Sequence, residues 1–126
     1  MREILFRGRS LITDDWVYGA YVRFRNVEGN VYDGIIEEYD GENLMSEIYS
    51  VNPKTVGQFT GIYDYNGKRI FEGDIIRGAY LNDDVVEYCH NGFFGVHKAK
   101  NGASICDVLT DNCTVVGNIY EQENEK

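Results

Sequence analysis

The chain has 126 residues, enough for one domain or one and a half, and its 12 Lys and Arg against 21 Asp and Glu give a formal net charge of −9 at pH 7. A field of this sign opposes nucleic-acid phosphates and anionic lipid, so the composition argues against a protein that works on either. Hydrophobic residues make up 43% and charged residues 26% of the chain, close to an average globular protein, which argues against wholesale disorder.

The sequence has none of the usual marks of export or membrane insertion. The first nine residues carry a charge every few positions, and no apolar run approaches the roughly 18 residues that span a bilayer. Cys89, Cys106 and Cys113 are an odd number of cysteines, and we expect them to be free and mostly buried thiols. Together these features predict a cytoplasmic protein that does not contact the membrane.

The residue types predict a mainly β fold. Val and Ile supply 23 residues against 9 for Leu and Ala, and β-branched side chains favour strands over helices. The 14 Gly and single Pro suit short strands joined by tight turns. Since no linker, low-complexity segment or internal repeat interrupts the chain, we expect a single domain over residues 1–126.

The first predicted element is an N-terminal β-hairpin, in which a turn at Glu28-Gly29-Asn30 joins Trp16–Arg25 to Val31–Glu38. The segment that follows allows two alternatives. Apolar residues at helical spacing indicate one short helix near residues 41–50, and a strand over Glu47–Val51 fits equally well.

Three Asn-Gly dipeptides predict further hairpins, because both residues tolerate the positive φ angles of a type I′ turn. They are Asn66-Gly67, Asn91-Gly92 and Asn101-Gly102. A two-residue turn at Asn91-Gly92 places His97 opposite Val86. The strands around these turns are expected at Ile62–Tyr65, Ile70-Phe71, Val85–His90, Phe93–His97, Ser104–Leu109 and Thr114–Tyr120.

Gly73 and Asp74 predict a corner in the chain before a buried strand that begins at Ile75. Glycine permits the tight bend, and the Asp74 carboxylate can accept backbone N–H groups that the bend leaves free. A bent strand entry of this kind suits the corner of a small barrel. We therefore assign structural turn roles to Asn66, Gly67, Gly73 and Asp74.

The segment that spans residues 55–76 resembles the signature of the YopX family, small proteins encoded by bacteriophages and prophages. It contains Gln58-Phe59-Thr60-Gly61 and Asn66-Gly67-Lys68-Arg69-Ile70-Phe71-Glu72-Gly73-Asp74. Three other pieces resemble that family in the right order: residues 2–8 its opening, residues 15–19 a segment of one subgroup, and residues 116–121 its close.

The resemblance implies a single YopX-like domain over residues 1–126. It implies a small SH3-like barrel at about residues 56–121, preceded by the N-terminal hairpin as an extension, and a tendency to form homo-oligomers. It brings no enzymatic activity, no cofactor and no catalytic residue to any position of this chain.

No group of residues in the sequence indicates catalysis or a metal ion. Cys89 and His90 are neighbours on a predicted strand, so their side chains are expected on opposite faces. His90 and His97 share a face but lie about 13 Å apart by strand rise, too far to bind one ion. The pair Asp83-Asp84 is expected to be a solvated turn. We therefore predict no catalytic, cofactor-binding or metal-ligating residues, and a protein that is not an enzyme.

The leading functional prediction is a phage accessory protein, a non-enzymatic homo-oligomer that binds another phage or host protein. The chain has 10 Tyr, 6 Phe and 1 Trp, and such residues are enriched at interfaces. Trp16, Tyr18, Tyr21 and Phe24 form the candidate self-association face. Packing in the core is the alternative for Trp16 and Phe24.

Two other functions stay open. The net charge of −9 suits an acidic mimic of DNA that inhibits a basic host protein. Tyr63, Tyr65, Lys68 and Arg69, which flank the Asn66-Gly67 turn, suit stacking and pairing with a nucleic acid on an SH3-like barrel, although the overall charge argues against that partner.

Overall fold

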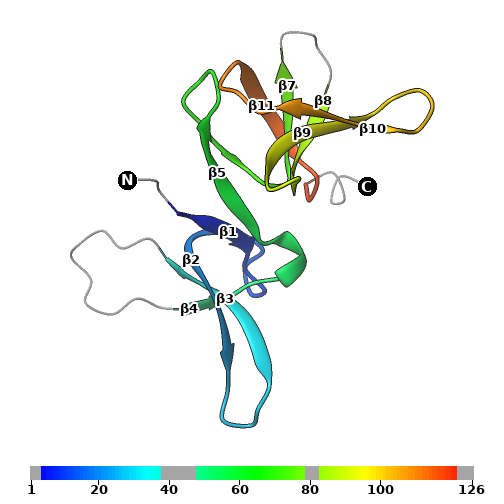
Figure 1. Ribbon diagram of the computed structural model, residues 1–126. Helices are drawn as coiled ribbons and strands as arrows, with labels where there is room; N and C mark the ends of the chain where they lie inside the picture. Colours follow the sequence, from blue (N-terminus) through cyan, green and yellow to red (C-terminus); the bar gives the residue numbers. More distant parts are fainter. Residues whose placement is uncertain (1–3, 38–47, 79–82, 122–126) are drawn as a thin grey trace. The chain divides into compact units, whose positions relative to one another are not determined.

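The computed structural model describes residues 4–37, 48–78 and 83–121. Its described secondary structure consists of β-strands and one 3-10 turn, η1 (Pro53–Thr55), so the predicted mainly β fold is confirmed. The chain forms two compact units, Met1–Gln58 and Phe59–Lys126 (Figure 1). Among the described residues no helix has the length and apolarity needed to cross a membrane.

The first unit is an antiparallel sheet in the order β4-β3-β2-β1. Its strands are β1 (Phe6–Arg9), β2 (Trp16–Arg25), β3 (Val31–Glu37) and β4 (Ile48–Ser50). The hairpin predicted from the sequence is β2–β3, and the outer edge of β1 pairs with the first two residues of β5 (Gly57–Tyr63). Ile35 and Val51 are fully buried in this unit.

Two features of the first unit bear on the sequence predictions. Strand β1 was not anticipated, because its Phe-Arg-Gly-Arg sequence contains no β-branched residue. Of the segment 41–50, only residues 48–50 are described, and they form a strand; the predicted helix otherwise lies outside the described residues.

The second unit is built on a five-stranded antiparallel sheet in the order β10-β9-β8-β7-β11. Its strands are β7 (Asp74–Gly78), β8 (Asp83–Cys89), β9 (Gly92–Lys98), β10 (Ser104–Val108) and β11 (Cys113–Asn118). From Phe59 onward β5 pairs with β6 (Arg69–Phe71) in the same unit. The buried core consists of Ile70, Ile76, Val86, Leu109 and Cys113.

The SH3-like barrel expected over residues 56–121 is not closed. A barrel requires the two outermost strands to pair, and among the described residues β10 and β11 form the two edges of an open sheet. The outer side of β11 is met instead by the turn after β5, where the Tyr65 N–H donates to the Cys113 carbonyl and the Val115 N–H donates to Asp64. This turn occupies the edge that closure would need.

The predicted Asn-Gly hairpins exist, but none is a type I′ turn centred on Asn-Gly. At Gly67 and Gly102 only the glycine has a positive φ, 81° and 87°, and the Gly67 and Gly102 N–H groups donate to Asp64 and Ala99 three residues back. These are type I turns followed by a glycine bulge. A three-residue loop of this kind needs positive φ at one position only.

The turn between β8 and β9 is shifted relative to the prediction. His90 and Asn91 carry the positive φ angles, 50° and 64°, while Gly92 already pairs with Cys89 as part of β9. The turn therefore centres on His90-Asn91. This slides the two strands by two residues, so that Val86 pairs with Gly95 rather than with His97.

Candidate functional site

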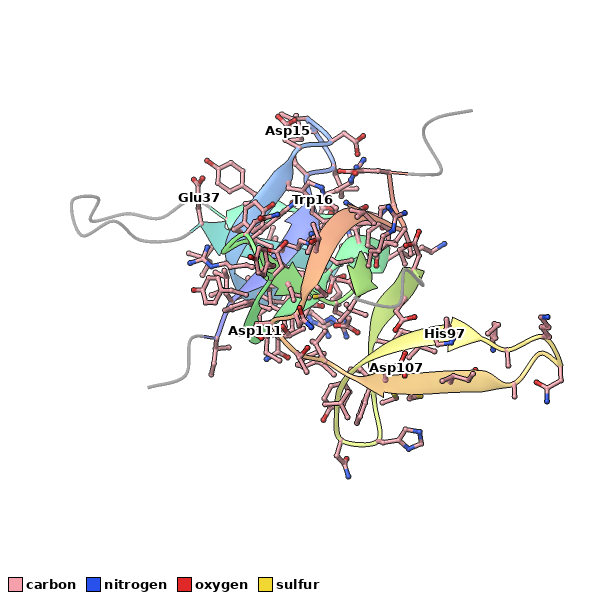
Figure 2. All side chains as sticks on the ribbon, turned by 90° about the horizontal axis from the view of Figure 1, so that it is seen from above. Asp15, Trp16, Glu37, His97, Asp107 and Asp111 are labelled. Atoms are coloured by element: carbon pink, nitrogen blue, oxygen red, sulfur yellow. The ribbon has the colours of Figure 1, made fainter. Side chains whose placement is uncertain are left out.

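Three side chains from neighbouring strands of the second unit converge on one another: Asp84 of β8, His97 of β9 and Asp107 of β10. Val85 pairs with Val96, so the next position of the same register sets Asp84 opposite His97. His97 pairs with Ile105 and Gly95 with Asp107, so Asp107 lies diagonally across from His97 on the same face of the sheet. Figure 2 shows His97 and Asp107 on these adjacent strands. We call these three residues the carboxylate–imidazole cluster.

The polar atoms of this cluster lie close together. His97 Nδ1 lies 2.7 Å from Asp84 Oδ1 and 3.5 Å from Asp107 Oδ2. The Asp84 side chain is 10% exposed, that of His97 23% and that of Asp107 55%. Within the described part of the chain, neither Asp84 Oδ1 nor His97 Nδ1 has a hydrogen-bond partner, although both atoms are buried.

Gly95 makes the space that the Asp84 carboxylate occupies. A Cβ atom at this position would lie 2.8 Å from Asp84 Oδ2 and 3.1 Å from its Cβ. Real Cβ atoms do not approach that closely, so any side chain at residue 95 would displace the carboxylate. Gly95 is itself buried in the middle of β9.

The cluster opens into a cavity of about 480 Å³. Besides Asp84, His97 and Asp107, its walls include apolar Ile76, Ile105 and Val108 and the polar Thr110 and Asn112, and Cys113 also lines it. The cavity therefore combines an apolar wall with convergent polar groups, the arrangement usual in ligand sites.

The neighbours of Asp84 have opposing effects on its pKa. Burial raises the pKa of Asp84, the nearby Asp107 carboxyl raises it further, and His97 offsets part of both effects. Two carboxylates thus face a single imidazole, and even a protonated His97 would leave one negative charge uncompensated. The prediction that Asp83-Asp84 is a solvated turn is wrong for Asp84, because the pair lies in β8; Asp83 is exposed and pairs with Arg77.

A second set, the thiol–imidazole cluster, consists of Cys89, His90 and Cys106, whose ligand-type atoms lie within 4.8 Å of one another. Cys89 and His90 were expected on opposite faces of a strand, but β8 ends at Cys89 and His90 belongs to the turn. Burial and the Cys106 thiol raise the pKa of Cys89. All three cysteines are free thiols; Cys113 is buried and Cys106 is exposed, so burial was predicted wrongly for Cys106. His90 and His97 belong to different clusters.

The predicted turn residues lie in two turns of the second unit. Gly73 has a φ of 91°, and the Phe71 N–H donates to the buried Asp74 carboxylate at 2.8 Å. Asn66 and Gly67 lie in the turn after β5, which is organised by a residue that sequence reasoning missed, Asp64. Its position just before the tyrosine–asparagine–glycine turn was the available signal, since Asp side chains accept N–H groups of the residues that follow them.

Asp64 is 5% exposed and accepts three backbone hydrogen bonds. Oδ1 accepts from the Asn66 and Lys68 N–H groups at 2.9 and 2.8 Å, and Oδ2 accepts from Val115 at 3.0 Å. Burial by itself would raise the pKa of this carboxyl, but the hydrogen bonds from Val115, Lys68 and Asn66 outweigh it and lower the pKa. Asp64 thus joins the turn to β11.

The candidate self-association residues Trp16, Tyr18, Tyr21 and Phe24 are all half-buried on β2. Strand alternation sets Tyr21 on the face opposite the other three, where its ring packs 5.7 Å from Phe6. The guanidinium groups of Arg7 and Arg9 lie over the Trp16 ring, at 4.4 and 5.1 Å from its centre. Phe24 stacks on Tyr32. The rings of Trp16, Tyr21 and Phe24 therefore each already contact another side chain of the same chain.

The candidate nucleic-acid residues are brought together only in part. Tyr63 packs edge-on against Phe59, and the Arg69 guanidinium lies 5.8 Å from the centre of that same ring. Tyr65 is 79% exposed in the turn, next to Asp64. Binding of nucleic acid at these residues stays a prediction.

Comparisons with known proteins place the chain in one family. The YopX family, described as "YopX protein", matches residues 5–124. No curated protein matches the chain. Among solved structures, the crystal structure of protein EF1440 from Enterococcus faecalis is similar, with 19% identity and a TM-score of 0.45, covering 98% of this chain and 97% of that one.

Proposed function

The chain belongs to the YopX family, and we propose that it is a non-enzymatic phage or prophage accessory protein that acts by binding proteins, in the first place a second copy of itself. The observation that carries the proposal is β10, an edge strand in which all five residues are exposed. An uncovered strand edge presents unpaired N–H and C=O groups to which another strand can pair.

The two edges of the second-unit sheet differ in how far their backbone groups are already hydrogen-bonded. The β11 edge is interrupted by a bulge between Val115 and Gly117, and Asp64 and Tyr65 bind its backbone groups. Beyond β10, by contrast, no further strand is paired within the described residues. The β10 edge is therefore the better template for strand addition.

The register identifies which groups of β10 point outward. The β9–β10 hairpin closes with the Ala99 N–H donating to the Ala103 carbonyl, so hydrogen-bonded pairs recur at His97–Ile105 and Gly95–Asp107. The backbone groups of Ser104, Cys106 and Val108 consequently face away from β9. A pairing strand would bind these three residues.

The charges around β10 favour a second copy in antiparallel orientation. Lys98 and Lys100 lie at the end where β10 begins, and Asp107 and Asp111 lie at the end where it finishes. Antiparallel pairing of two β10 strands brings the basic end of each copy to the acidic end of the other, whereas parallel pairing sets like charges together. The twofold axis then passes beside Cys106.

The thiols and the net charge support the non-enzymatic role, the compartment and the kind of partner. Cys113 is the thiol that lines the cavity, and burial raises its pKa, with Asp64 and Asp111 adding to the effect. A thiol kept protonated is a poor nucleophile, which supports a non-enzymatic role. Free cysteines support a reducing compartment, here the bacterial cytoplasm, and the net charge of −9 supports protein rather than nucleic acid as a partner.

Light scattering coupled to size exclusion tests self-association directly. The wild-type protein is expected to elute with twice the chain mass at tens of micromolar. Cys106→Lys, which adds a charge to the β10 edge, is expected to raise the dimer dissociation constant at least tenfold, and Val116→Lys on β11 is the matched control that leaves it unchanged. A monomeric wild-type protein at these concentrations contradicts the proposal.

Cross-linking distinguishes the β10 edge from other surfaces. Paired residues in an antiparallel ladder have Cα atoms about 5.5 Å apart, so a short thiol-to-thiol cross-linker should join Cys106 to Cys106 of the second copy. The Cys89→Ser variant should cross-link and the Cys106→Ser variant should not. A dimer that survives Cys106→Lys and is not cross-linked through Cys106 would point to the aromatic residues of β2 instead.

A further inference from the structure

The carboxylate–imidazole cluster has the spacing of a metal site. An ion bound at about 2.0–2.2 Å sets neighbouring ligand atoms about 2.8–3.1 Å apart in octahedral and about 3.3–3.6 Å apart in tetrahedral geometry. His97 Nδ1 lies 3.5 Å from Asp107 Oδ2, within the tetrahedral range, and 2.7 Å from Asp84 Oδ1, just below the octahedral one. One ligand atom from each of the three side chains lies within 4.8 Å of the ligand atoms of the other two.

Two of these atoms are buried without a hydrogen-bond partner, which is the independent observation that points to a ligand. The Asp84 side chain is 10% exposed, and its Oδ1, like His97 Nδ1, has no hydrogen-bond partner in the described residues. Leaving such atoms unsatisfied destabilises the fold, and a charged atom does so more than a neutral one. Native structures rarely retain that cost unless an ion, a water or a ligand removes it.

A simple ion pair between Asp84 and His97 accounts for the cluster less well. One imidazolium can balance only one of the two carboxylates that lie within 3.5 Å of His97 Nδ1. A divalent cation between the three side chains would contact the imidazole nitrogen and one oxygen of each carboxylate. Its two positive charges also balance both carboxylates, which one imidazolium cannot do.

From these observations we infer that Asp84, His97 and Asp107 bind a divalent first-row transition-metal ion of the Zn²⁺, Co²⁺ or Mn²⁺ type. One imidazole nitrogen with two carboxylate oxygens is a donor set that such ions accept. The adjoining cavity of about 480 Å³ leaves room for water molecules at the remaining coordination positions. This inference does not depend on the proposed self-association.

The ligands come from three consecutive strands of the sheet, so the ion would tie the edge strand β10 to β8 and β9. Gly95 lies at the centre of the arrangement, and the absence of a side chain there lets the Asp84 carboxylate face His97. The metal is therefore expected to stabilise the second unit and to lower the mobility of β10.

Cobalt absorption and competition with a chromogenic chelator test the site. The protein, prepared with EDTA and then freed of it, is titrated with Co²⁺ and with Zn²⁺. We expect binding with micromolar affinity, cobalt d–d bands, and none of the near-ultraviolet charge transfer that thiolate ligands produce. Asp107→Asn is expected to weaken binding at least tenfold; this carboxylate is 55% exposed, so the variant should fold.

Asp83→Asn is the matched control. It makes the same chemical change one residue from Asp84, on the other face of β8, and removes only an exposed pair with Arg77. The affinity of Asp83→Asn for Co²⁺ and Zn²⁺ should stay within twofold of that of the wild type, and so should the affinity of Cys106→Ser. Equal binding by Asp107→Asn and Asp83→Asn overturns the inference. So does a thiolate band that Cys106→Ser abolishes, because the ion would then lie in the thiol–imidazole cluster. A failure to bind Co²⁺, Zn²⁺ and Mn²⁺ at hundreds of micromolar overturns it as well, whatever the oligomeric state.

Discussion

Replacing Asp64 by alanine is expected to lower the free energy of unfolding of the second unit by about 2–4 kcal/mol. The carboxylate accepts backbone hydrogen bonds from Asn66, Lys68 and Val115. Hydrogen bonds to a charged group contribute roughly 1.5–3 kcal/mol each. Their sum is discounted because the carboxylate itself gives up hydration when it is buried, and because the freed N–H groups of an exposed turn regain water.

Asparagine at the same position separates hydrogen bonding from side-chain volume. Its single amide oxygen can keep the bonds from Asn66 and Lys68, but its NH₂ group would then face the Val115 N–H, so that two donors oppose each other. We expect Asp64→Asn to cost about 1–2 kcal/mol, less than Asp64→Ala. Urea unfolding followed by circular dichroism measures both variants, with an unchanged m-value as the sign that only stability has changed.

The lowered pKa of Asp64 fixes the sign of its contribution to pH dependence. The unfolded chain binds the proton at a higher pH than the folded chain does, so the stabilisation is complete above the unfolded pKa of about 3.9 and is lost as pH falls through the folded pKa. The difference in stability between wild type and Asp64→Ala should therefore be constant near neutral pH and shrink under acid conditions. An Asp64→Ala protein within about 0.5 kcal/mol of wild type at pH 7 would refute this account of the turn.

Three further variants test other parts of the second unit by thermal and urea unfolding. Gly73→Ala should destabilise by about 1–3 kcal/mol, because its φ is 91° and the new Cβ would lie 3.0 Å from the Tyr120 ring; an unchanged midpoint would show that the corner tolerates a side chain. The double change His90→Asn and Asn91→Gly, which installs Asn-Gly at the two positive-φ positions, should stabilise by up to about 1 kcal/mol, and a loss of stability would contradict the assigned register. Ile70→Ala should cost about 2–5 kcal/mol, since this side chain is fully buried in the core; a cost below about 1 kcal/mol would mean that the core is packed differently.

Local chemistry was enough to predict most of the elements. The β-branched composition predicted strands, and the bounds of β2 were read correctly from its flanking turn residues. Gly73 and Asp74 were singled out because a positive φ and an unsatisfied N–H each require a particular residue type, and both requirements can be read from neighbours in the chain. Strand β1 escaped because Arg7 and Arg9, which lie over the Trp16 ring, do not mark a strand by themselves.

The carboxylate–imidazole cluster was out of reach of the same reasoning, and one turn explains why. The sequence predicts a β8–β9 turn at Asn91-Gly92, which sets Val86 opposite His97 and Asp84 in a solvated turn. The observed turn at His90-Asn91 slides the strands by two residues and brings Asp84 opposite His97. A two-residue slip keeps every side chain on its expected face, so the alternation of apolar residues, which is the sequence signal for a strand, does not distinguish the two registers.

The sequence by itself determined most of the strands and the approximate places of the turns, because these depend on contacts between residues close together along the chain. Only the tertiary structure decided the register of β8 on β9, the open edge at β10 and the position of Asp84 beside His97 and Asp107. Each of these is a choice among locally equivalent pairings, made where Ile70, Ile76 and Val86 from different strands share one core. That choice is a property of packing between segments distant in sequence, and no single segment encodes it.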